Sequence, residues 1–419
     1  MKVLIKSAKI YNSVSAFHLN TKDILVEDGV ITSIENEIND DQAQLVQGKG
    51  LAVSAGWFDL YSVVREPGNE AKDTIQTLLD SAQVGGFTDL IGVSGSTPSL
   101  YSRAQIEFVK NNSKGRLVNI HPVGTITEKK EGKNITELYD LHKAGALAFS
   151  DGKRHFKNPE LLKRALLYIK PFNGKLMVYG EDADIADYGM VNEGVVGAGL
   201  GMKVRPALAE EIALQRNIHL VEYTDSSIHV QAISSKGSVE IVKAAKAKGV
   251  NITCDVNLAN LLYTDEKVGD FDTTYKVLPV LRTEEDRQAL LAGLESGVID
   301  GISSGHTPQD NESKACEFDH AEFGMMTLEA MGASLLDEGS LTEESIFSLL
   351  SEKSRDIFKV TIPEIKVGEL ASLTVCSNNS WSLAKADITS ISKNSPFIGN
   401  EFNHKVEAVL NNNMLYVNK

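Results

Sequence analysis

The chain has 419 residues, of which 42% are hydrophobic and 24% charged, a balance typical of soluble globular proteins long enough for one large and one smaller domain. Its formal net charge of -15 opposes attraction to phosphate backbones and anionic membranes, which excludes nucleic acid and membrane surfaces as expected partners. Cys254, Cys316 and Cys376 lack C-x-x-C spacing, as expected of packing residues in a reducing compartment. Because the N-terminus lacks a signal-like apolar core, we expect a cytoplasmic protein.

Both ends of the chain have the pattern of a small β-sheet. Residues 1–53 contain the alternating segments KVLIKSAKIYN, DILVEDG and VITSIENEI, separated by turn residues. Residues 366–419 repeat this pattern in ASLTVCS, KVEAVLNN and NMLYVNK. We therefore predict one small β domain built from residues 1–53 and 366–419, with the two termini as neighbours.

Residues 54–365 alternate strand-like runs with amphipathic helical segments, the pattern of a parallel sheet with crossover helices. In chain order, the strand candidates are WFDLYSV, TDLIGVS, LVNIHPVG, ALAFSD, KLMVYGE, IHVQAIS, VNITCDVN and IDGISSG. The clearest helical segments are DTIQTLLDSAQVGG, ITELYDLHKAG, PELLKRALLYIK, SVEIVKAAKAKG and TEEDRQALLAGLESG. Eight such units predict an α/β fold, a closed (β/α)8 TIM barrel, with its reactive groups at the carboxyl ends of the strands.

Motifs along the whole chain resemble those of the dihydroorotase family of the amidohydrolase superfamily, which acts in pyrimidine biosynthesis. The segments that carry the resemblance are DLYSVVREPG, VGGFTDL, GALAFSDGK, YGED, HVQAISS, NLANL, VLPVLR, SGHTPQ and SKNSPFIGNEF. The resemblance implies the amidohydrolase-type TIM barrel, here residues 54–365, with a small flanking β-sandwich domain built from both termini. The family is a hydrolase family and uses zinc.

The departures from the family pattern fall on its metal positions. The residues that stand where the family has ligands are Tyr61, Val63, Asp151, Tyr179, Ala232 and Gly305. Of these, only Asp151 is a usual ligand, whereas catalytic zinc takes about three protein ligands. Gly305 replaces an aspartate that also shuttles a proton in the family. We therefore expect an empty metal site with no cofactor, and we expect Tyr61 and Tyr179 to occupy part of the space around it.

The substrate-carboxylate positions of the family are partly kept. Arg65 remains, while Ser96 and Gln309 stand at the other two positions. Arg65 is able to hold a carboxylate through two hydrogen bonds. The simpler interpretation, which we favour, is that Arg65 pairs with a neighbouring Asp or Glu.

Histidines near the ends of the barrel strands raise the alternative of a rebuilt metal site. His121 is expected to be a hydrogen-bonded core residue, and His229 is expected to face the helices if Ala232 faces the interior, because the two are an odd number of residues apart. His306 stands where the family also has His. A new cluster of Asp151, His121 and His306 is the remaining candidate. Glu181 and Asp182 of YGED are expected to be structural.

Three functions follow from these observations. The one we favour is a catalytically inactive dihydroorotase-like pseudoenzyme that acts as a scaffold for aspartate carbamoyltransferase and forms a homodimer, as the resemblance implies. The alternative is an active dihydroorotase, or a related cyclic amidohydrolase, that hydrolyses dihydroorotate to N-carbamoyl-aspartate at a rebuilt metal site. A third possibility is a sensor that binds a carboxylate through Arg65 without turnover.

Overall fold

The computed structural model describes residues 1–418, and its central feature is a parallel β-barrel. Its eight strands are hydrogen-bonded in the order β15-β14-β13-β10-β9-β8-β7-β6. A parallel bridge between Ser62 and His306 closes the ring, with the Val63 N–H donating to the His306 carbonyl at 3.0 Å. The strands are β6 (Trp57–Val64), β7 (Phe87–Ser94), β8 (Asn119–Gly124), β9 (Ala148–Phe149), β10 (Leu176–Tyr179), β13 (Ile228–Gln231), β14 (Ile252–Asn257) and β15 (Gly301–Ser303). All eight lie within or overlap the predicted runs, which confirms the TIM-type barrel.

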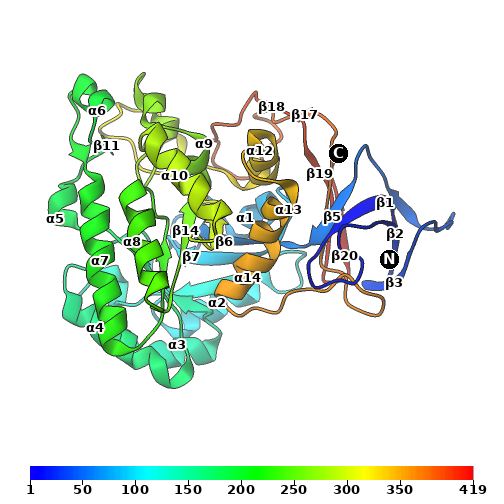
Figure 1. Cartoon of the computed structure of the whole chain (residues 1–419), viewed down its shortest axis with the longest axis horizontal. Helices are drawn as coiled ribbons and strands as arrows, with labels where there is room; N and C mark the ends of the chain where they lie inside the picture. Colours follow the sequence, from blue (N-terminus) through cyan, green and yellow to red (C-terminus); the bar gives the residue numbers. More distant parts are fainter. Residues whose placement is uncertain (419) are drawn as a thin grey trace.

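Helices surround the barrel and cover its outer face (Figure 1). The main ones are α1 (Ile75–Val84), α2 (Arg103–Ser113), α3 (Leu138–Ala144), α4 (Pro159–Ile169), α7 (Ala207–Thr224), α8 (Lys236–Ala247), α10 (Glu284–Glu295), α12 (Met331–Glu338), α13 (Glu343–Ser348) and α14 (Ser354–Ile357). Local sequence signals set their ends. Thr283 caps α10 in a reciprocal box with Asp286, and Gly145 ends α3 in the left-handed conformation that glycine adopts without strain.

Short elements lie in the connections around the carboxyl ends of the strands. They are α5 (Ala183–Ala186), β11 (Val191–Asn192), α6 (Val195–Leu200), β12 (Val204–Arg205), α9 (Leu258–Leu262) and α11 (Asn311–Lys314). The glycine-rich stretch at 196–203 therefore lies between β10 and β13, as part of a loop excursion. The segment 306–320 contains α11, whose Asp310 cap accepts from the Ser313 N–H at 2.7 Å.

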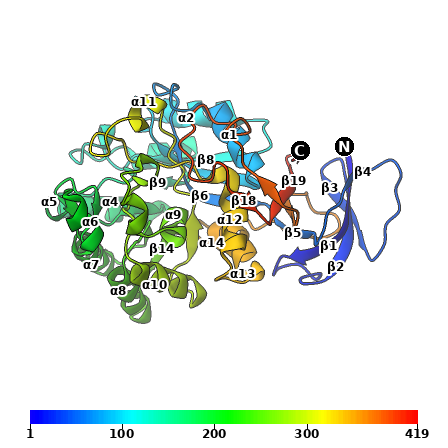
Figure 2. The ribbon, with the colours of Figure 1, turned by 90° about the horizontal axis from the view of Figure 1, so that it is seen from above.

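The two ends of the chain form one curled sheet beside the barrel (Figure 2). Its order is β20-β19-β16-β5-β1-β2-β3, with β4 also paired to β1. The strands are β1 (Lys2–Tyr11), β2 (Thr21–Glu27), β3 (Val30–Glu35), β4 (Gln44–Val46), β5 (Ala52–Ala55), β16 (Leu373–Ser377), β19 (Lys405–Asn411) and β20 (Met414–Val417), while β17 (Trp381–Ser382) and β18 (Glu401–Phe402) form a separate pair. The prediction that both termini build one β domain is confirmed. β5 crosses the expected boundary after residue 53.

Trp57 marks the junction between this sheet and the barrel. Its backbone N–H donates to Thr374 Oγ1 of β16 at 3.2 Å, and its ring packs edge-on against Phe87 of β7. A Cβ on Gly332 would lie 2.2 Å from the indole, so only glycine lets α12 approach this closely. The contact fixes the sheet against the amino-terminal side of the barrel, away from the strand ends that hold the chemistry.

Candidate site at the mouth of the barrel

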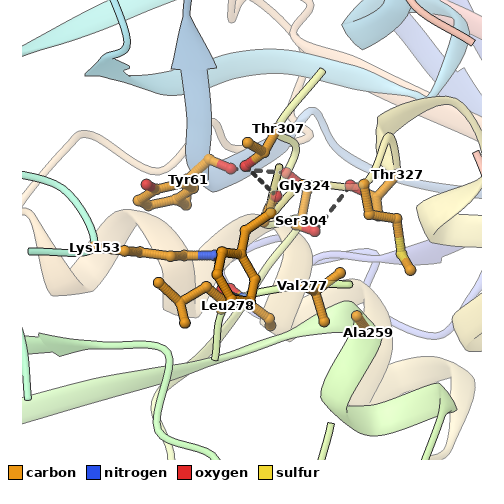
Figure 3. A pocket seen from close by; sticks show the side chains of 13 residues that line it. Tyr61, Lys153, Ala259, Val277, Leu278, Ser304, Thr307, Gly324 and Thr327 are labelled. Atoms are coloured by element: carbon orange, nitrogen blue, oxygen red, sulfur yellow. Dashed lines mark hydrogen bonds between the residues drawn. The ribbon is translucent and has the colours of Figure 1, made fainter. Parts of the chain in front are cut away.

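A cavity of about 140 Å³ lies at the carboxyl ends of β6, β14 and β15. It is lined by Tyr61, Lys153, Asn257, Ala259, Val277, Leu278, Ser304, Gly305, Thr307, Phe323, Gly324, Met325 and Thr327. Figure 3 shows the Lys153 side chain extending between Tyr61 and Leu278. The position agrees with the expectation that reactive groups of such a barrel gather at this end.

Tyr61 and Val63 both lie on β6 and belong to one apolar cluster of the barrel interior, but only Tyr61 also borders the cavity. Tyr61 is 5% exposed and borders the cavity, with the Lys153 ammonium 4.7 Å from its ring centroid. Burial raises the pKa of the Tyr61 phenol, which therefore stays protonated. Val63 packs into an apolar cluster of the barrel interior. Tyr61 thus borders a space that stays open beside it.

Asp151 follows β9 and is committed to the backbone of the preceding loop. Its Oδ1 accepts from the N–H groups of Ile126 and Thr127 at 2.9 and 3.0 Å, and its Oδ2 accepts from Thr127 Oγ1 at 2.5 Å. Burial raises its pKa, and the Thr127 and Ile126 hydrogen bonds oppose that rise. Both carboxylate oxygens therefore have partners within the protein.

The other positions of the expected metal site, Tyr179, Ala232 and Gly305, carry no side chain that usually binds zinc. Tyr179 is buried outside the cavity wall, with its hydroxyl donating to Glu181 Oε1 at 3.4 Å. Ala232 has a left-handed backbone and donates its N–H to Asp255 Oδ1 at 2.9 Å. Gly305, also left-handed, does line the cavity. Within residues 1–418 no group of three or more His, Cys, Asp or Glu side chains is placed to hold a metal ion. These side chains do not fit a zinc ion.

The alternative cluster of Asp151, His121 and His306 does not form. His121 Nε2 lies 2.9 Å from Asp89 Oδ1, so the expected hydrogen bond is confirmed, but the side chain is partly exposed and not a core residue. His306 is fully buried and its Nδ1 accepts the Thr327 N–H at 3.2 Å. Burial lowers the pKa of His306 to about 3, so the ring is neutral.

Arg65, Ser96 and Gln309 each have a partner that differs from a bound carboxylate. The Arg65 guanidinium donates to the Pro308 carbonyl from Nε at 3.2 Å and from Nη2 at 2.8 Å, so the expected pairing with Asp or Glu was wrong. Ser96 Oγ donates to the Pro98 carbonyl at 3.0 Å. Gln309 donates to the Phe323 carbonyl at 2.7 Å and accepts from Lys72 Nζ at 2.6 Å. The three side chains are held by the loops around them.

The expected structural roles of Glu181 and Asp182 agree with the geometry. Glu181 forms a buried ion pair with Arg205, and Asp182 caps α5 by accepting from the N–H groups of Asp184 and Ile185. Neither carboxylate is free for acid and base chemistry.

His229 departs from the expectation that it faces the helices. Its Nε2 lies 2.8 Å from Asp255 Oδ2, and its ring packs edge-on against Phe358 within the barrel interior. The left-handed backbone at Ala232 breaks the strand alternation on which the expectation rested. The Asp255 carboxylate therefore joins β13 to β14.

Lys153 is the side chain of the mouth that the sequence analysis missed. Its ammonium donates to the Leu278 carbonyl, and burial lowers its pKa to about 7, against the opposing charges of Asp255 and Asp59. The signal was present in GALAFSDGK, where a lysine closely follows the end of a barrel strand. A buried amine with a pKa close to neutral can both donate hydrogen bonds and exchange a proton.

The fold defines the class of protein. The structure of an L-hydantoinase (dihydropyrimidinase) from Arthrobacter aurescens superposes with a TM-score of 0.86 at 21% identity, covering 100% of this chain and 96% of that one. A dihydropyrimidinase from Brevibacillus agri superposes with a TM-score of 0.83 at 18% identity, over 100% and 95% of the two chains. The chain therefore has the amidohydrolase fold of the hydantoinases. Within residues 1–418, no helix combines the length and apolar character needed to cross a membrane.

Sequence comparison defines the family. A family model described as Dihydro-orotase-like matches residues 50–238. The dihydroorotase of Citrifermentans bemidjiense is 34% identical over 405 residues, covering 95% of both chains. That of Acetivibrio thermocellus is 35% identical over 401 residues, covering 94% of both. The chain belongs to the dihydroorotase family.

Proposed function

We propose that this family member has lost the metal ligands and the dihydroorotase activity, and that it serves pyrimidine biosynthesis as a homodimeric scaffold for aspartate carbamoyltransferase. The observation that carries the proposal is the position of Asp151. It is the one carboxylate among the six expected metal positions, and both of its oxygens accept hydrogen bonds from residues 126 and 127. A catalytic zinc site needs about three protein ligands and an open position for water.

Gly305 also supports the proposed loss of activity, because the reaction requires a proton transfer. Hydrolysis or closure of a cyclic amide needs a group that moves a proton to and from the ring nitrogen. Glycine has no side chain for this step, and Asn257, whose Cγ would lie 3.0 Å from a Cβ at position 305, is an amide. Position 305 therefore does not supply the proton carrier that the family has there, which supports the proposed loss of activity.

The retained frame supports a binding role. Arg282 of the VLPVLR motif donates to Asn192 Oδ1 at 2.9 Å and to the Arg205 carbonyl at 2.6 Å, which ties β11, β12 and the loop before α10 together. Such buried hydrogen bonds keep the shell of the barrel rigid. A rigid shell suits a protein whose role is to hold a partner.

The test combines elemental analysis with an assay of dihydroorotate hydrolysis on one sample grown with added zinc. The relative from Citrifermentans bemidjiense, purified in the same way, is the control. We expect no stoichiometric zinc and no rate above background. Binding of about one zinc per chain together with turnover would favour the alternative, an active cyclic amidohydrolase with a rebuilt site.

The scaffold role has a separate test. The chain and the aspartate carbamoyltransferase of its host are mixed at micromolar concentration and separated by size-exclusion chromatography with light scattering. We expect the two proteins to elute together, in a complex whose mass includes a homodimer of this chain. Separate elution at all concentrations would rule out the scaffold and leave the loss of activity standing.

A further inference from the structure

A second cavity, of about 610 Å³, opens beside the first at the mouth of the barrel. The two cavities share Lys153 and Leu278 in their walls. The outer cavity, as we call it, is walled by the loop at 130–133, the segment 151–157 after β9, and residues 181–188 around α5. Charged side chains of both signs line it, so the charge that it offers to a ligand depends on which of them form ion pairs with one another.

The acidic side chains of the outer cavity already have partners. Four pair with cations: Glu131 with Lys133, Asp184 with Lys157, Asp187 with Lys203 and Glu181 with Arg205. Asp151, the fifth, accepts from Ile126 and Thr127. The acids of the wall therefore leave no oxygen dedicated to the remaining cations.

Three cations of the same wall bond only to neutral oxygens. Lys130 donates to the Ser94 carbonyl at 2.7 Å, Arg154 donates to the Lys130 carbonyl at 3.1 Å, and Lys153 donates to the Leu278 carbonyl. Over residues 1–418, none of the three forms an ion pair. A chain with net charge -15 thus concentrates unpaired positive charge at one hollow.

Burying these cations has a desolvation cost, which lowers the pKa values of the two lysine amines. Burial, with repulsion from Arg154 and Arg65, lowers the pKa of Lys130 to about 8, and burial lowers that of Lys153 to about 7. Both amines would hold their protons more tightly beside an anion, because an opposite charge within a few ångströms favours the charged form. The charge of Asp151 offsets part of this desolvation for Lys130, as the charges of Asp255 and Asp59 do for Lys153, and a negative ligand in the cavity would offset more of it.

We propose that the outer cavity is a binding site for a small multivalent oxyanion, held by Lys130, Lys153 and Arg154. The shared chemistry is a set of phosphate or carboxylate oxygens, which such donors bind through charge-assisted hydrogen bonds. Arg65 lines neither cavity, so this site is distinct from the position that the family resemblance assigns to a substrate carboxylate. The inference goes beyond the scaffold proposal and stands whether or not the carbamoyltransferase binds.

The test is isothermal titration calorimetry of the full chain at low ionic strength, with inorganic pyrophosphate and citrate as separate probes. We expect saturable 1:1 binding of at least one probe, weakened about 10- to 100-fold in Lys130→Met and in Lys153→Met. The matched control is Lys157→Met, which removes a cation of the same wall that already pairs with Asp184. It should change the affinity less than about threefold.

A second readout isolates Lys153. A charge-assisted contact between its ammonium and an anion is screened by salt, so titrations at two ionic strengths measure the contribution of this side chain to binding. We expect the dependence of the affinity on salt to fall in Lys153→Met while circular dichroism shows the variant folded. Preference for pyrophosphate or for citrate assigns the ligand to phosphates or to polycarboxylates. No saturable heat with either probe, or equal weakening in Lys157→Met, would overturn the proposal.

Discussion

A carboxylate at the amino-terminal end of the barrel and two lysines at its mouth show two ways of placing buried charge. At the amino-terminal end, the Arg355 guanidinium contacts Asp89 at 2.6 Å, and His121 approaches the other oxygen of the same carboxylate. At the mouth, Lys130 and Lys153 bond only to backbone carbonyls. In barrels of this type the lower face supplies stability and the upper face supplies function. The paired carboxylate lies away from the two cavities, whereas the two lysines stand in the wall of the outer one.

The pKa of Asp89 reflects the strong pairing at the amino-terminal end of the barrel. Burial alone would raise it, but the hydrogen bond with His121 and the charge of Arg355 outweigh burial and hold the pKa below its usual range. Asp89 is therefore ionised at neutral pH, and its stability contribution is lost only as the pH falls through that lowered value.

The largest expected effect comes from breaking the lower pair. Arg355→Met leaves the Asp89 carboxylate buried without its ion-pair partner, with hydrogen bonds to His121, Asn119 and Thr88, and we expect a loss of about 3–5 kcal/mol in the free energy of unfolding. Urea denaturation at pH 7 measures it. The control is Lys359→Met, which removes an exposed pair with Asp356 and should cost less than about 1 kcal/mol. Similar losses in both variants would contradict the contrast.

A smaller effect is expected at Gly305 in the mouth. Its φ of +65° is strained for any residue with a Cβ, and that Cβ would lie 3.0 Å from Asn257 Cγ. Asn257 cannot move freely, because its amide donates to the Leu278 carbonyl at 3.2 Å and accepts from Ser303 Oγ at 2.9 Å. We expect Gly305→Ala to lower the free energy of unfolding by about 1–2 kcal/mol.

Gly297→Ala is the matched control for this variant. Gly297 has a similar φ of +73°, but no atom lies within 4 Å of the place that a Cβ would occupy there. Its substitution therefore measures the backbone strain alone, and the difference between the two variants measures the contact with Asn257. A larger loss at Gly297 would show that the mouth can relax around a side chain.

The smallest effect is a gain in stability. Because the folded-state pKa of Lys153 is about 7, below the ordinary 10.5, its buried ammonium destabilises the folded state most below pH 7, and this penalty fades as the pH rises toward 10.5. We expect Lys153→Met to raise the free energy of unfolding by about 1 kcal/mol at pH 6 and by less at pH 9. Urea titrations at both pH values check it. A loss of stability at pH 6 would mean that the contacts of the ammonium with the Leu278 carbonyl and the Tyr61 ring outweigh its desolvation.

Much of the fold was predictable, because its signals are local or periodic. The eight strand runs and helices such as α10, with its Thr283 cap, follow from alternation, amphipathic spacing and capping residues. β5 was divided by the predicted boundary after residue 53, since its four buried residues show no alternation. Their assignment depends on pairing with β16, which lies more than 300 residues away.

The site was less predictable, because it depends on partners brought together by the fold. The carbonyl of Pro308 that binds Arg65 carries no signal in the sequence, and the left-handed Ala232 reversed the expected direction of His229. Lys153 went unnoticed because a lysine after a strand is usually solvated. Its significance comes from burial beside Tyr61, which only the folded barrel creates.

The place of β5 in the terminal sheet has a consequence for biosynthesis on the ribosome. β5 is hydrogen-bonded on one side to β1 and on the other to β16, which begins at Leu373. Until that residue has left the exit tunnel, β5 has an unpaired edge that invites pairing with other nascent chains. The whole barrel is translated in the interval, so early release or a premature stop leaves a finished barrel with an open β edge. Chaperone occupancy on polysomes should therefore persist until the last strands emerge.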